Sequence, residues 1–181
     1  MERKSICTNV IMAGFGGQGL MFIGKLLAYC AMKRGLNVTW IPSYGPEMRG
    51  GTANCTVVIS DQPIGSPVIT SPDALIIMNN PSLEAFEPRI KTDGLLFINN
   101  NLVTCQIKRK DLQVISVPAN DAAVEAGEKK AANMVILGTY VARTGILTKE
   151  DVAAGFKEFF GAKTEYLASN MQALEKGMSY A

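Results

Sequence analysis

The feature that most constrains the fold is an apolar run that enters a cluster of glycines and continues into a long apolar segment. Residues 10–19 read Val-Ile-Met-Ala-Gly-Phe-Gly-Gly-Gln-Gly, and no proline interrupts residues 20–34. This order predicts a strand over 5–13, a tight turn and a helix over 20–33, because glycine accepts the positive φ angles that such a turn requires. The glycines have the G-x-G-x-x-G spacing of a dinucleotide turn. By itself that spacing indicates only that a polar group docks at the helix start.

The position that should hold a ribose does not support a dinucleotide site. A nicotinamide enzyme carries an Asp or Glu about 20 residues beyond the glycines, at the end of the second strand, which we predict over 36–41. Residues 40–43 are Trp-Ile-Pro-Ser, and the next acid is Glu47 in the following loop. An independent nucleotide-binding module therefore stays only as an alternative from another class, beside a non-catalytic Rossmann-like assembly scaffold.

The loop after the second strand is the other unusual stretch. Residues 42–51 read Pro-Ser-Tyr-Gly-Pro-Glu-Met-Arg-Gly-Gly, and their two prolines and three glycines predict a defined turn structure. Since the carboxyl ends of parallel strands meet at one edge of a sheet, we expect this loop beside the glycine turn. Glu47 and Arg49 either belong to a site there or form a pair that only stiffens the loop.

The remaining chain alternates strand and helix patterns. The predicted strands are 52–60, 64–69, 74–78, 94–99 and 113–117; the predicted helices are a short one from Ser82 to before Pro88, 121–143 with a break at Gly127, 152–160 and 164–178. Residues 52–60 alternate apolar and polar side chains, which favours a half-buried antiparallel strand. We predict an α/β fold, with a Rossmann-like mostly parallel sheet, helices on both faces and an antiparallel strand insertion. Its length suits a single domain over 1–181.

The predicted helix over 20–33 is apolar on nearly all sides. A helix that lies on a sheet needs only one apolar stripe, but this one also places Phe22 and Tyr29 away from that stripe. We expect the second face to be covered, either by a partner chain or by the last helix of the same domain.

Composition excludes several kinds of chemistry. The chain has no histidine, which removes the commonest general base and every Ser-His or Cys-His pair, so a free-standing hydrolase is not expected. Cys7, Cys30, Cys55 and Cys105 are too far apart in sequence for a metal or Fe–S ligand set, and each lies in an apolar run. We predict that all four are small buried apolar residues, and we predict no metal site.

Charge and hydropathy indicate where the chain acts. A net charge of +2 is too small to suggest nucleic-acid binding, and no apolar window is long enough to predict a membrane span. The sequence begins without a recognisable signal peptide. We expect a cytoplasmic protein that binds neither nucleic acid nor membrane.

Two stretches together resemble a known family. Residues 14–19 and residues 42–54, Pro-Ser-Tyr-Gly-Pro-Glu-Met-Arg-Gly-Gly-Thr-Ala-Asn, are similar to the gamma subunit of the 2-oxoacid:ferredoxin oxidoreductases, and 65–67, 79–82 and 133–138 agree. The similarity covers nearly the whole chain, so residues 1–181 are expected to form one pyruvate/ketoisovalerate oxidoreductase gamma-type domain. The Pro-Glu-Met-Arg-Gly-Gly form resembles the 2-oxoglutarate type, with branched-chain 2-oxoacid and pyruvate enzymes as alternatives.

The resemblance implies a role in a larger enzyme. Such enzymes convert a 2-oxoacid and coenzyme A to acyl-CoA and CO₂ and pass electrons to ferredoxin. They use thiamine diphosphate, Mg²⁺ and [4Fe–4S] clusters, which the resemblance assigns to alpha, beta and, in some enzymes, delta subunits. The gamma chain is expected to bind none of these cofactors by itself, to contribute no catalytic residue and to be inactive alone.

The resemblance also selects candidate site residues. They are Gly16, Gly17, Gln18 and Gly19 in the turn and Tyr44, Glu47, Arg49 and Gly50 in the loop. In one interpretation, backbone N–H groups and the Arg49 guanidinium contact the phosphates of coenzyme A or line its entry path. In the other, both stretches form the docking surface for the alpha chain, with Arg49 pairing across the interface.

Overall fold

The computed structural model describes residues 6–44, 51–160 and 166–181. Its strands are β1 (Cys7–Phe15), β2 (Asn37–Tyr44), β3 (Thr52–Ser60), β4 (Ala74–Ile77), β5 (Leu95–Asn99) and β6 (Gln113–Val117). Its helices are α1 (Leu20–Lys33), α2 (Asn80–Phe86), the 3₁₀ turn η1 (Glu87–Arg89), α3 (Ala119–Glu125), α4 (Ala132–Thr144), α5 (Lys149–Phe160) and α6 (Leu167–Met178). The two predicted halves of 121–143 are thus separate helices.

The described strands form one sheet in the order β2-β3-β1-β4-β5-β6. β1, β4, β5 and β6 pair in parallel, whereas β3 runs antiparallel to both β1 and β2. β2 is therefore parallel to β1 although β3 separates them. The predicted mostly parallel sheet with an antiparallel insertion is confirmed, and the insertion lies between the first two strands of the chain.

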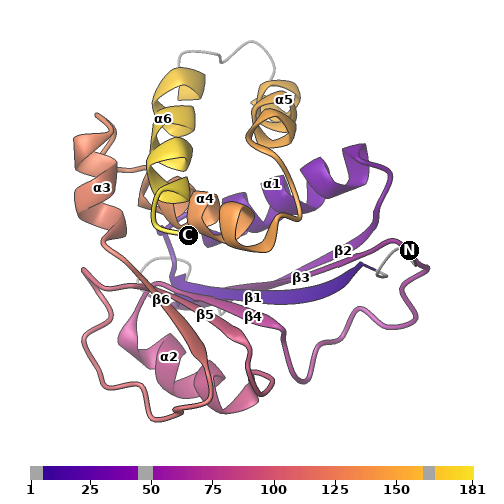
Figure 1. Cartoon of the computed structure of the whole chain (residues 1–181), viewed down its shortest axis with the longest axis vertical. Coiled ribbons are helices and arrows are strands. Elements are labelled where there is room, and N and C mark those ends of the chain that lie inside the picture. Colours follow the sequence, from indigo (N-terminus) through magenta and orange to yellow (C-terminus); the bar gives the residue numbers. More distant parts are fainter. Residues whose placement is uncertain (1–5, 45–50, 161–165) are drawn as a thin grey trace.

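One face of the sheet carries the larger core. Helices α1, α4, α5 and α6 lie on this side in Figure 1. Every residue of α4 from Ala132 to Val141 is buried, because α4 packs against α6, α3 and α1 as well as facing the sheet. This explains why the helix is apolar around most of its circumference rather than along one stripe.

The opposite face has a thinner cover. Ile11 and Ala13 of β1 and Leu75 of β4 pack there with Leu83 of α2, which lies below the sheet in Figure 1. The buried carboxylate of Glu87 accepts hydrogen bonds from consecutive backbone N–H groups, those of residues 108 and 109, at 2.6 and 2.7 Å. These bonds fasten the segment before β6 to η1. The prediction of helices on both faces is confirmed.

The second apolar face of α1 is covered from within the chain. Phe22 makes edge-to-face contacts with Phe156 and Phe159 of α5, at centroid distances of 6.0 and 6.2 Å. Tyr29 stacks edge-on against Phe159 and donates a 2.8 Å hydrogen bond to Glu158. An internal helix was one of the two expectations, but the covering helix is α5 and not the last helix, α6.

Local signals near α4 and α5 are confirmed. Gly145 follows α4 with a φ of 63°, the left-handed conformation in which glycine ends helices. At the start of α5, the Thr148 hydroxyl accepts from the Asp151 N–H at 3.1 Å, and the Asp151 carboxylate accepts from the Thr148 N–H at 2.7 Å. This reciprocal pair is a capping box with Asp in the fourth position.

Other sequence predictions are wrong. Residues 64–69 form no strand, and α2 begins at Asn80, with Asn79 rather than Ser82 as its N-cap: the Ser82 N–H donates to the Asn79 side chain at 2.8 Å. Cys7 is exposed and Cys105 is half-buried, so only Cys30 and Cys55 are the buried apolar residues predicted. Cys7 opens β1 at the sheet margin, where an apolar neighbourhood in sequence does not guarantee a covering layer.

Candidate functional site

The glycine turn joins the end of β1 to the start of α1. Gly17 and Gly19 have φ angles of 96° and 76°, which L residues other than glycine rarely adopt. Gly19 is the N-cap of α1, and no side chain caps the helix. The turn therefore leaves N–H groups of the first helical turn without intrahelical partners, and it stands at the carboxyl edge of the sheet where ligands of α/β proteins bind.

The side-chain amide of Gln18 forms two hydrogen bonds with backbone groups of this chain. Its Oε1 accepts from the Phe15 N–H at 2.6 Å, and its Nε2 donates to the Met78 carbonyl, just past β4, at 3.0 Å. A Cβ placed at Gly14 would lie 2.3 Å from that Oε1. Gln18 thus closes the turn and ties it to the neighbouring strand, and the space at Gly14 is filled by this side chain.

A second amide occupies the space beside Gly19. Asn133, in the first turn of α4, donates from Nδ2 to the Gly19 carbonyl at 3.3 Å. A Cβ at Gly19 would lie 2.2 Å from that nitrogen. Asn133 is only 8% exposed, so the starts of α1 and α4 meet through a partly buried contact. At two of the three glycines of the G-x-G-x-x-G spacing, Gly14 and Gly19, a side chain of the same protein therefore occupies the space that a Cβ would take.

The structure brings the two predicted stretches together at their ends. The Gly16 N–H donates to the Gly51 carbonyl at 2.9 Å. Ala53 of β3 pairs with Gly14 of β1 on one side and with Tyr44 of β2 on the other. The predicted proximity of the stretches is thus met at these flanks. Glu47, Arg49 and Gly50 lie outside the described residues, and of Tyr44 only the backbone place in β2 is described.

An apolar groove of about 450 Å³ runs from the glycine turn toward β2. Its lining combines turn glycines with apolar side chains: Phe15, Gly16, Gly17, Gly19, Leu20, Met21, Phe22, Trp40, Pro42 and Ala53. Phe15 keeps 39% of its surface exposed. A groove of this composition fits an apolar group better than a phosphate.

A second hollow, of about 340 Å³, lies on the other side of the turn, toward β4 and β5. Its lining residues are Gly17, Gln18, Met78, Leu102, Asn120, Lys129, Lys130, Ala132 and Asn133, and we call it the lysine hollow. Sequence reasoning missed Lys129, Lys130 and Asn120. The adjacent lysines before an apolar helix were the one available signal, and nothing local indicated that they face residues more than 100 positions earlier.

The sheet order argues further against a dinucleotide. In nucleotide-binding Rossmann folds the second strand lies beside the first, which brings its terminal acid to the ribose. Here β3 separates β2 from β1. The residue at the expected position, Trp40, lines the apolar groove instead.

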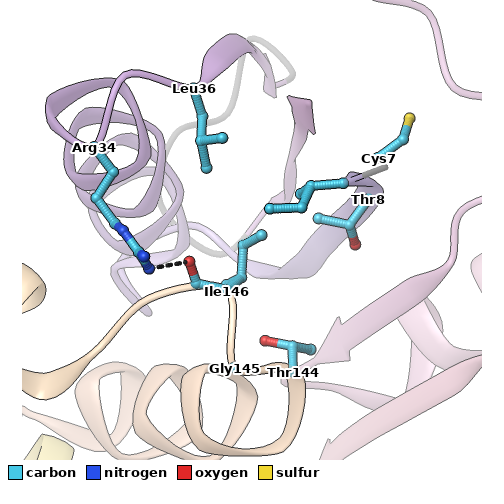
Figure 2. A pocket seen from close by; sticks show the side chains of 8 residues that line it. Cys7, Thr8, Arg34, Leu36, Thr144, Gly145 and Ile146 are labelled. Carbon is cyan, nitrogen blue, oxygen red and sulfur yellow. Dashed lines mark hydrogen bonds between the residues drawn. The ribbon is translucent and has the colours of Figure 1, made fainter. Parts of the chain in front are cut away.

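A third hollow, of about 360 Å³, lies at the opposite edge of the sheet (Figure 2). Thr8, Thr144 and Arg34 contribute polar groups to it. The Arg34 guanidinium is already engaged, because it donates to the Ile146 carbonyl at 3.0 Å and lies 3.4 Å from the Asp151 carboxylate. Arg34 therefore fastens the start of α5 to the end of α1, and the amino edge of a parallel sheet is not where ligands usually bind.

The buried thiols are unreactive by environment. Burial raises the pKa of Cys30 to about 12, and burial likewise raises the pKa of Cys55 to about 12. A thiol needs a lowered pKa to act as a nucleophile or metal ligand near neutral pH. Across residues 6–44, 51–160 and 166–181, no three His, Cys, Asp or Glu side chains group as a metal site would require. Within the same ranges, none of the helices has the length and apolar character of a membrane span.

These features define a class: a Rossmann-like α/β domain whose glycine turn is packed by its own side chains and flanked by an apolar groove and a lysine hollow. The sequence pattern of the family described as "Pyruvate ferredoxin/flavodoxin oxidoreductase" matches residues 9–180, and the chain belongs to this family. The resemblance seen in the two glycine-containing stretches is thereby confirmed.

Individual relatives carry two different substrate names. The ketoisovalerate oxidoreductase subunit VorA of Methanothermobacter marburgensis is 38% identical over 175 residues, which are 96% of this chain and 36% of VorA. This chain spans the same share, 36%, of VorA from Methanothermobacter thermautotrophicus. The 2-oxoglutarate synthase subunit KorC of Methanocaldococcus jannaschii is 31% identical over 99% of this chain and 97% of its own length.

A solved structure agrees with the fold. The gamma subunit of a keto/oxoacid ferredoxin oxidoreductase from Geobacter sulfurreducens superposes with a TM-score of 0.81 at 28% identity, covering 96% of this chain and 98% of that one. The Rossmann-like α/β fold predicted from the sequence is therefore also the fold of that gamma subunit.

Proposed function

We propose that this chain is the gamma-type component of a 2-oxoacid:ferredoxin oxidoreductase, and that residues 1–181 act in it as one domain. The complete enzyme would convert a 2-oxoacid and coenzyme A to acyl-CoA and CO₂, with two electrons passed to ferredoxin. The observation that carries the proposal is the end-to-end match with a separate gamma subunit of nearly equal length, at a TM-score of 0.81.

For the substrate we propose 2-oxoglutarate. Support comes from the Pro-Glu-Met-Arg-Gly-Gly form of residues 46–51 and from KorC, a relative of almost the same length. The higher identity to VorA makes a branched-chain 2-oxoacid the competing choice. Substrate selection would depend mainly on the subunits that hold thiamine diphosphate, so assays of the assembled enzyme with both 2-oxoacids decide between them.

The chemistry would come from partner subunits. Thiamine diphosphate with Mg²⁺ would supply decarboxylation and [4Fe–4S] clusters would supply electron transfer, in alpha, beta and in some enzymes delta subunits, in the cytoplasm. The described residues of this chain offer no metal-ligand cluster, and burial raises the pKa of the Cys30 and Cys55 thiols to about 12. Its own residues would position and shield, so we expect no turnover from the isolated chain.

The glycine-turn edge is the surface we propose to face the rest of the enzyme. The groove presents Phe15, Phe22 and Trp40 at this edge, and the candidate loop with Arg49 begins beside it. Apolar lining favours contact with a neighbouring subunit on the groove side. The candidate residues Gly16, Gly17 and Gly19 border both this surface and any path for coenzyme A.

Purification of the untagged partners with this chain tests the proposal. We expect a brown complex that contains thiamine diphosphate and Fe–S subunits and that reduces ferredoxin only in the presence of a 2-oxoacid and coenzyme A. A colourless monomer that binds NAD would contradict the proposal and support the nucleotide-binding module.

The Arg49→Ala variant separates the two roles of the loop. A raised KM for coenzyme A in a normally assembled complex supports contact with the ligand. Loss of assembly, with an unchanged KM in the complex that does form, supports pairing with a neighbouring subunit.

A further inference from the structure

We propose that the outer edge of β6 binds an extended, acidic segment of a neighbouring subunit, which adds to the six-stranded sheet as a further strand. The proposal rests on the proposed function, because that function supplies the neighbouring subunits. No residue of β6 lines the apolar groove or the lysine hollow, so this surface is separate from the glycine turn.

The backbone of β6 is the first support. β6 is an end strand of the described sheet and pairs in parallel with β5. The Gln113 N–H donates to the Gly94 carbonyl, and the Val117 carbonyl accepts from the Asn100 N–H, both at 3.0 Å. Because successive residues of a strand direct their N–H and C=O groups to alternate sides, residues 113, 115 and 117 bond β5. The N–H and C=O groups of residues 114 and 116 therefore point away from the sheet, where an added strand can reach them.

The other end strand, β2, is blocked against such an addition. The Gly16 N–H donates to the Gly51 carbonyl, so odd-numbered residues of β3 bond β1 and its even-numbered residues bond β2. Pro42 lies opposite Cys55, and its missing N–H therefore belongs to the outward row of β2. A proline at an edge position interrupts the hydrogen bonds that an added strand would need.

β6 carries none of the residues that usually protect an edge. Its sequence, Gln-Val-Ile-Ser-Val, contains neither proline nor a charged side chain, and it has the β-branched composition of a strand that pairs readily. Val114, in the middle of the free edge, keeps 42% of its surface exposed. An unprotected edge beside a protected one indicates that β6 is covered in the assembled protein.

Charge around the start of β6 selects the chemistry of the occupant. Lys108 and Lys110 are exposed in the segment that leads into β6, and the backbone of this segment is held by Glu87. Arg143, at the end of α4, donates to the Gln113 side chain at 3.1 Å, which places a third cation at the start of the strand. Among the described residues, none of these three cations has an ion-pair partner.

The acids at this end do not balance those cations. Asp111 is paired with Arg109, and Asp93 donates its backbone N–H to the Asp111 carbonyl at 3.1 Å. Cations thus remain in excess beside a free strand edge. Carboxylates on an added strand would be attracted to this end, whereas the same edge of a second copy would bring like charges with it.

Amide hydrogen exchange at single residues decides whether the edge is covered. In the isolated full chain, the amides of Val114 and Ser116 should exchange rapidly, while that of Ile115 is protected by β5. In the assembled enzyme, exchange at Val114 and Ser116 should slow by about tenfold or more. Cross-linking from a cysteine placed by Ser116→Cys, followed by peptide mapping, should identify an extended acidic segment of a neighbouring subunit.

A proline on the free edge tests the backbone contacts. Val114→Pro removes an outward N–H and no bond to β5, so the urea midpoint of the isolated chain should change little. Its affinity for the partner subunits should fall by about fivefold or more, since a hydrogen bond is lost and the ring obstructs the added strand. Val114→Thr keeps both the N–H and the branched shape, and it is the matched control with unchanged affinity.

A charge variant tests the acidic character of the occupant. Lys108→Gln/Lys110→Gln should weaken binding to the partner subunits by about threefold to tenfold at low salt. The difference from the unchanged chain should disappear at about 1 M salt, where the Debye length falls to about 3 Å. Lys157→Gln, at an exposed lysine of α5, is the control and should bind normally.

The possible failures are distinguishable. Equal exchange at Val114 and Ser116 in the isolated chain and in an active assembled enzyme would overturn the strand site while leaving the gamma-type role intact. Protection that appears in the isolated chain as its concentration rises would overturn the proposed occupant and assign the edge to a second copy. Protection by an acidic segment in a complex that reduces no ferredoxin would support the strand site and reject the proposed function. The exchange measurement needs no substitution, so it decides the proposal even where Val114→Pro lowers stability.

Discussion

The crossing of α4 with α6 and the turn between β1 and α1 both depend on glycine, but different atoms occupy the space that glycine leaves. At the crossing, a Cβ on Gly138 would lie 2.0 Å from the Leu174 carbonyl oxygen, and one on Gly177 would lie 1.8 Å from that of Val135. At the turn, a Cβ on Gly14 or Gly19 would meet side-chain amides, those of Gln18 and Asn133. Backbone cannot withdraw without moving a helix, whereas an amide can rotate.

This difference changes how the G-x-G-x-x-G spacing is interpreted. In a dinucleotide site the glycines let a pyrophosphate approach the backbone. Here two of them, Gly14 and Gly19, let the chain's own amides approach, whereas a Cβ on the adjacent Gly17 would meet no atom within 4 Å. Glycine spacing therefore reports close approach without identifying the group that approaches.

The largest effect is expected at the helix crossing. Gly138→Ala and Gly177→Ala should each lower the free energy of unfolding by about 3 kcal/mol, because the new methyl group collides with backbone and forces two buried helices apart. The crossing also contains the 2.7 Å hydrogen bond from Thr139 to the Gly177 carbonyl. Urea denaturation measures the change. Gly65→Ala, where the added Cβ meets nothing within 4 Å, is the matched control and should stay within about 0.5 kcal/mol.

The next effect separates two glycines of the turn. Gly17→Ala should cost about 1 kcal/mol, since only its positive φ is unfavourable for alanine. Gly19→Ala should cost about 2–3 kcal/mol, because it carries the same backbone strain and also displaces the Asn133 amide. Denaturant unfolding of both variants and of Gly19→Ala/Asn133→Ala measures the coupling. Equal costs for Gly17→Ala and Gly19→Ala would show that Asn133 yields freely.

Gln18→Ala should cost about 1–2 kcal/mol. The substitution removes two hydrogen bonds, so the Phe15 N–H and the Met78 carbonyl must form hydrogen bonds with water instead. Amide hydrogen exchange at Phe15 should accelerate more than exchange in β4, which would locate the loss at the turn. Unchanged exchange at Phe15 would mean that this side chain does not close the turn in solution.

The smallest effect concerns two further glycines, Gly24 and Gly155, each of which packs against the sulfur atom of a buried cysteine. Cβ atoms on Gly24 and Gly155 would lie 2.4 Å from Cys55 Sγ and 2.2 Å from Cys30 Sγ. Burial raises the pKa of both thiols to about 12, while the unfolded chain ionises near the ordinary value of 9.0. The unfolded state then loses protons that the folded state keeps, so stability falls as pH rises.

Between pH 8 and pH 9 the free energy of unfolding should fall by about 0.4 kcal/mol for each thiol. Cys55→Ala should remove its share of this slope, and Cys7→Ala, at an exposed thiol, serves as the control. Urea denaturation at the two pH values provides the measurement. A slope that Cys55→Ala leaves unchanged would contradict the assignment to buried thiols.

Much of the fold was predictable from local patterns. The apolar run of β1, the alternation of β3, the break near Gly127 and the capping box at Thr148 each depend on residues close together in the sequence. Two of the predictions that went wrong, the strand over 64–69 and the N-cap at Ser82, concern short segments in which neighbouring polar residues offer competing local hydrogen bonds.

The candidate site was predictable only in part. The glycine turn and its proximity to Gly51 followed from strand order along the sequence. The lysines of the hollow did not, because Lys129 reaches the turn only after α4 packs on α1. The partner of Gly19, Asn133, is likewise 114 positions away. Such contacts depend on how helices stack, which periodicity does not encode.

Local chemistry thus determined the elements and the excluded reactions. The missing histidine, the separated cysteines and the absent ribose acid are properties of the chain in any conformation. Tertiary packing alone decided that β3 lies between β1 and β2 and that α5 covers Phe22 and Tyr29. It also decided which atoms occupy the space beside each glycine. The physical reason is that elements follow from short-range sterics and hydrogen bonding, whereas neighbours follow from burying apolar faces contributed by distant segments.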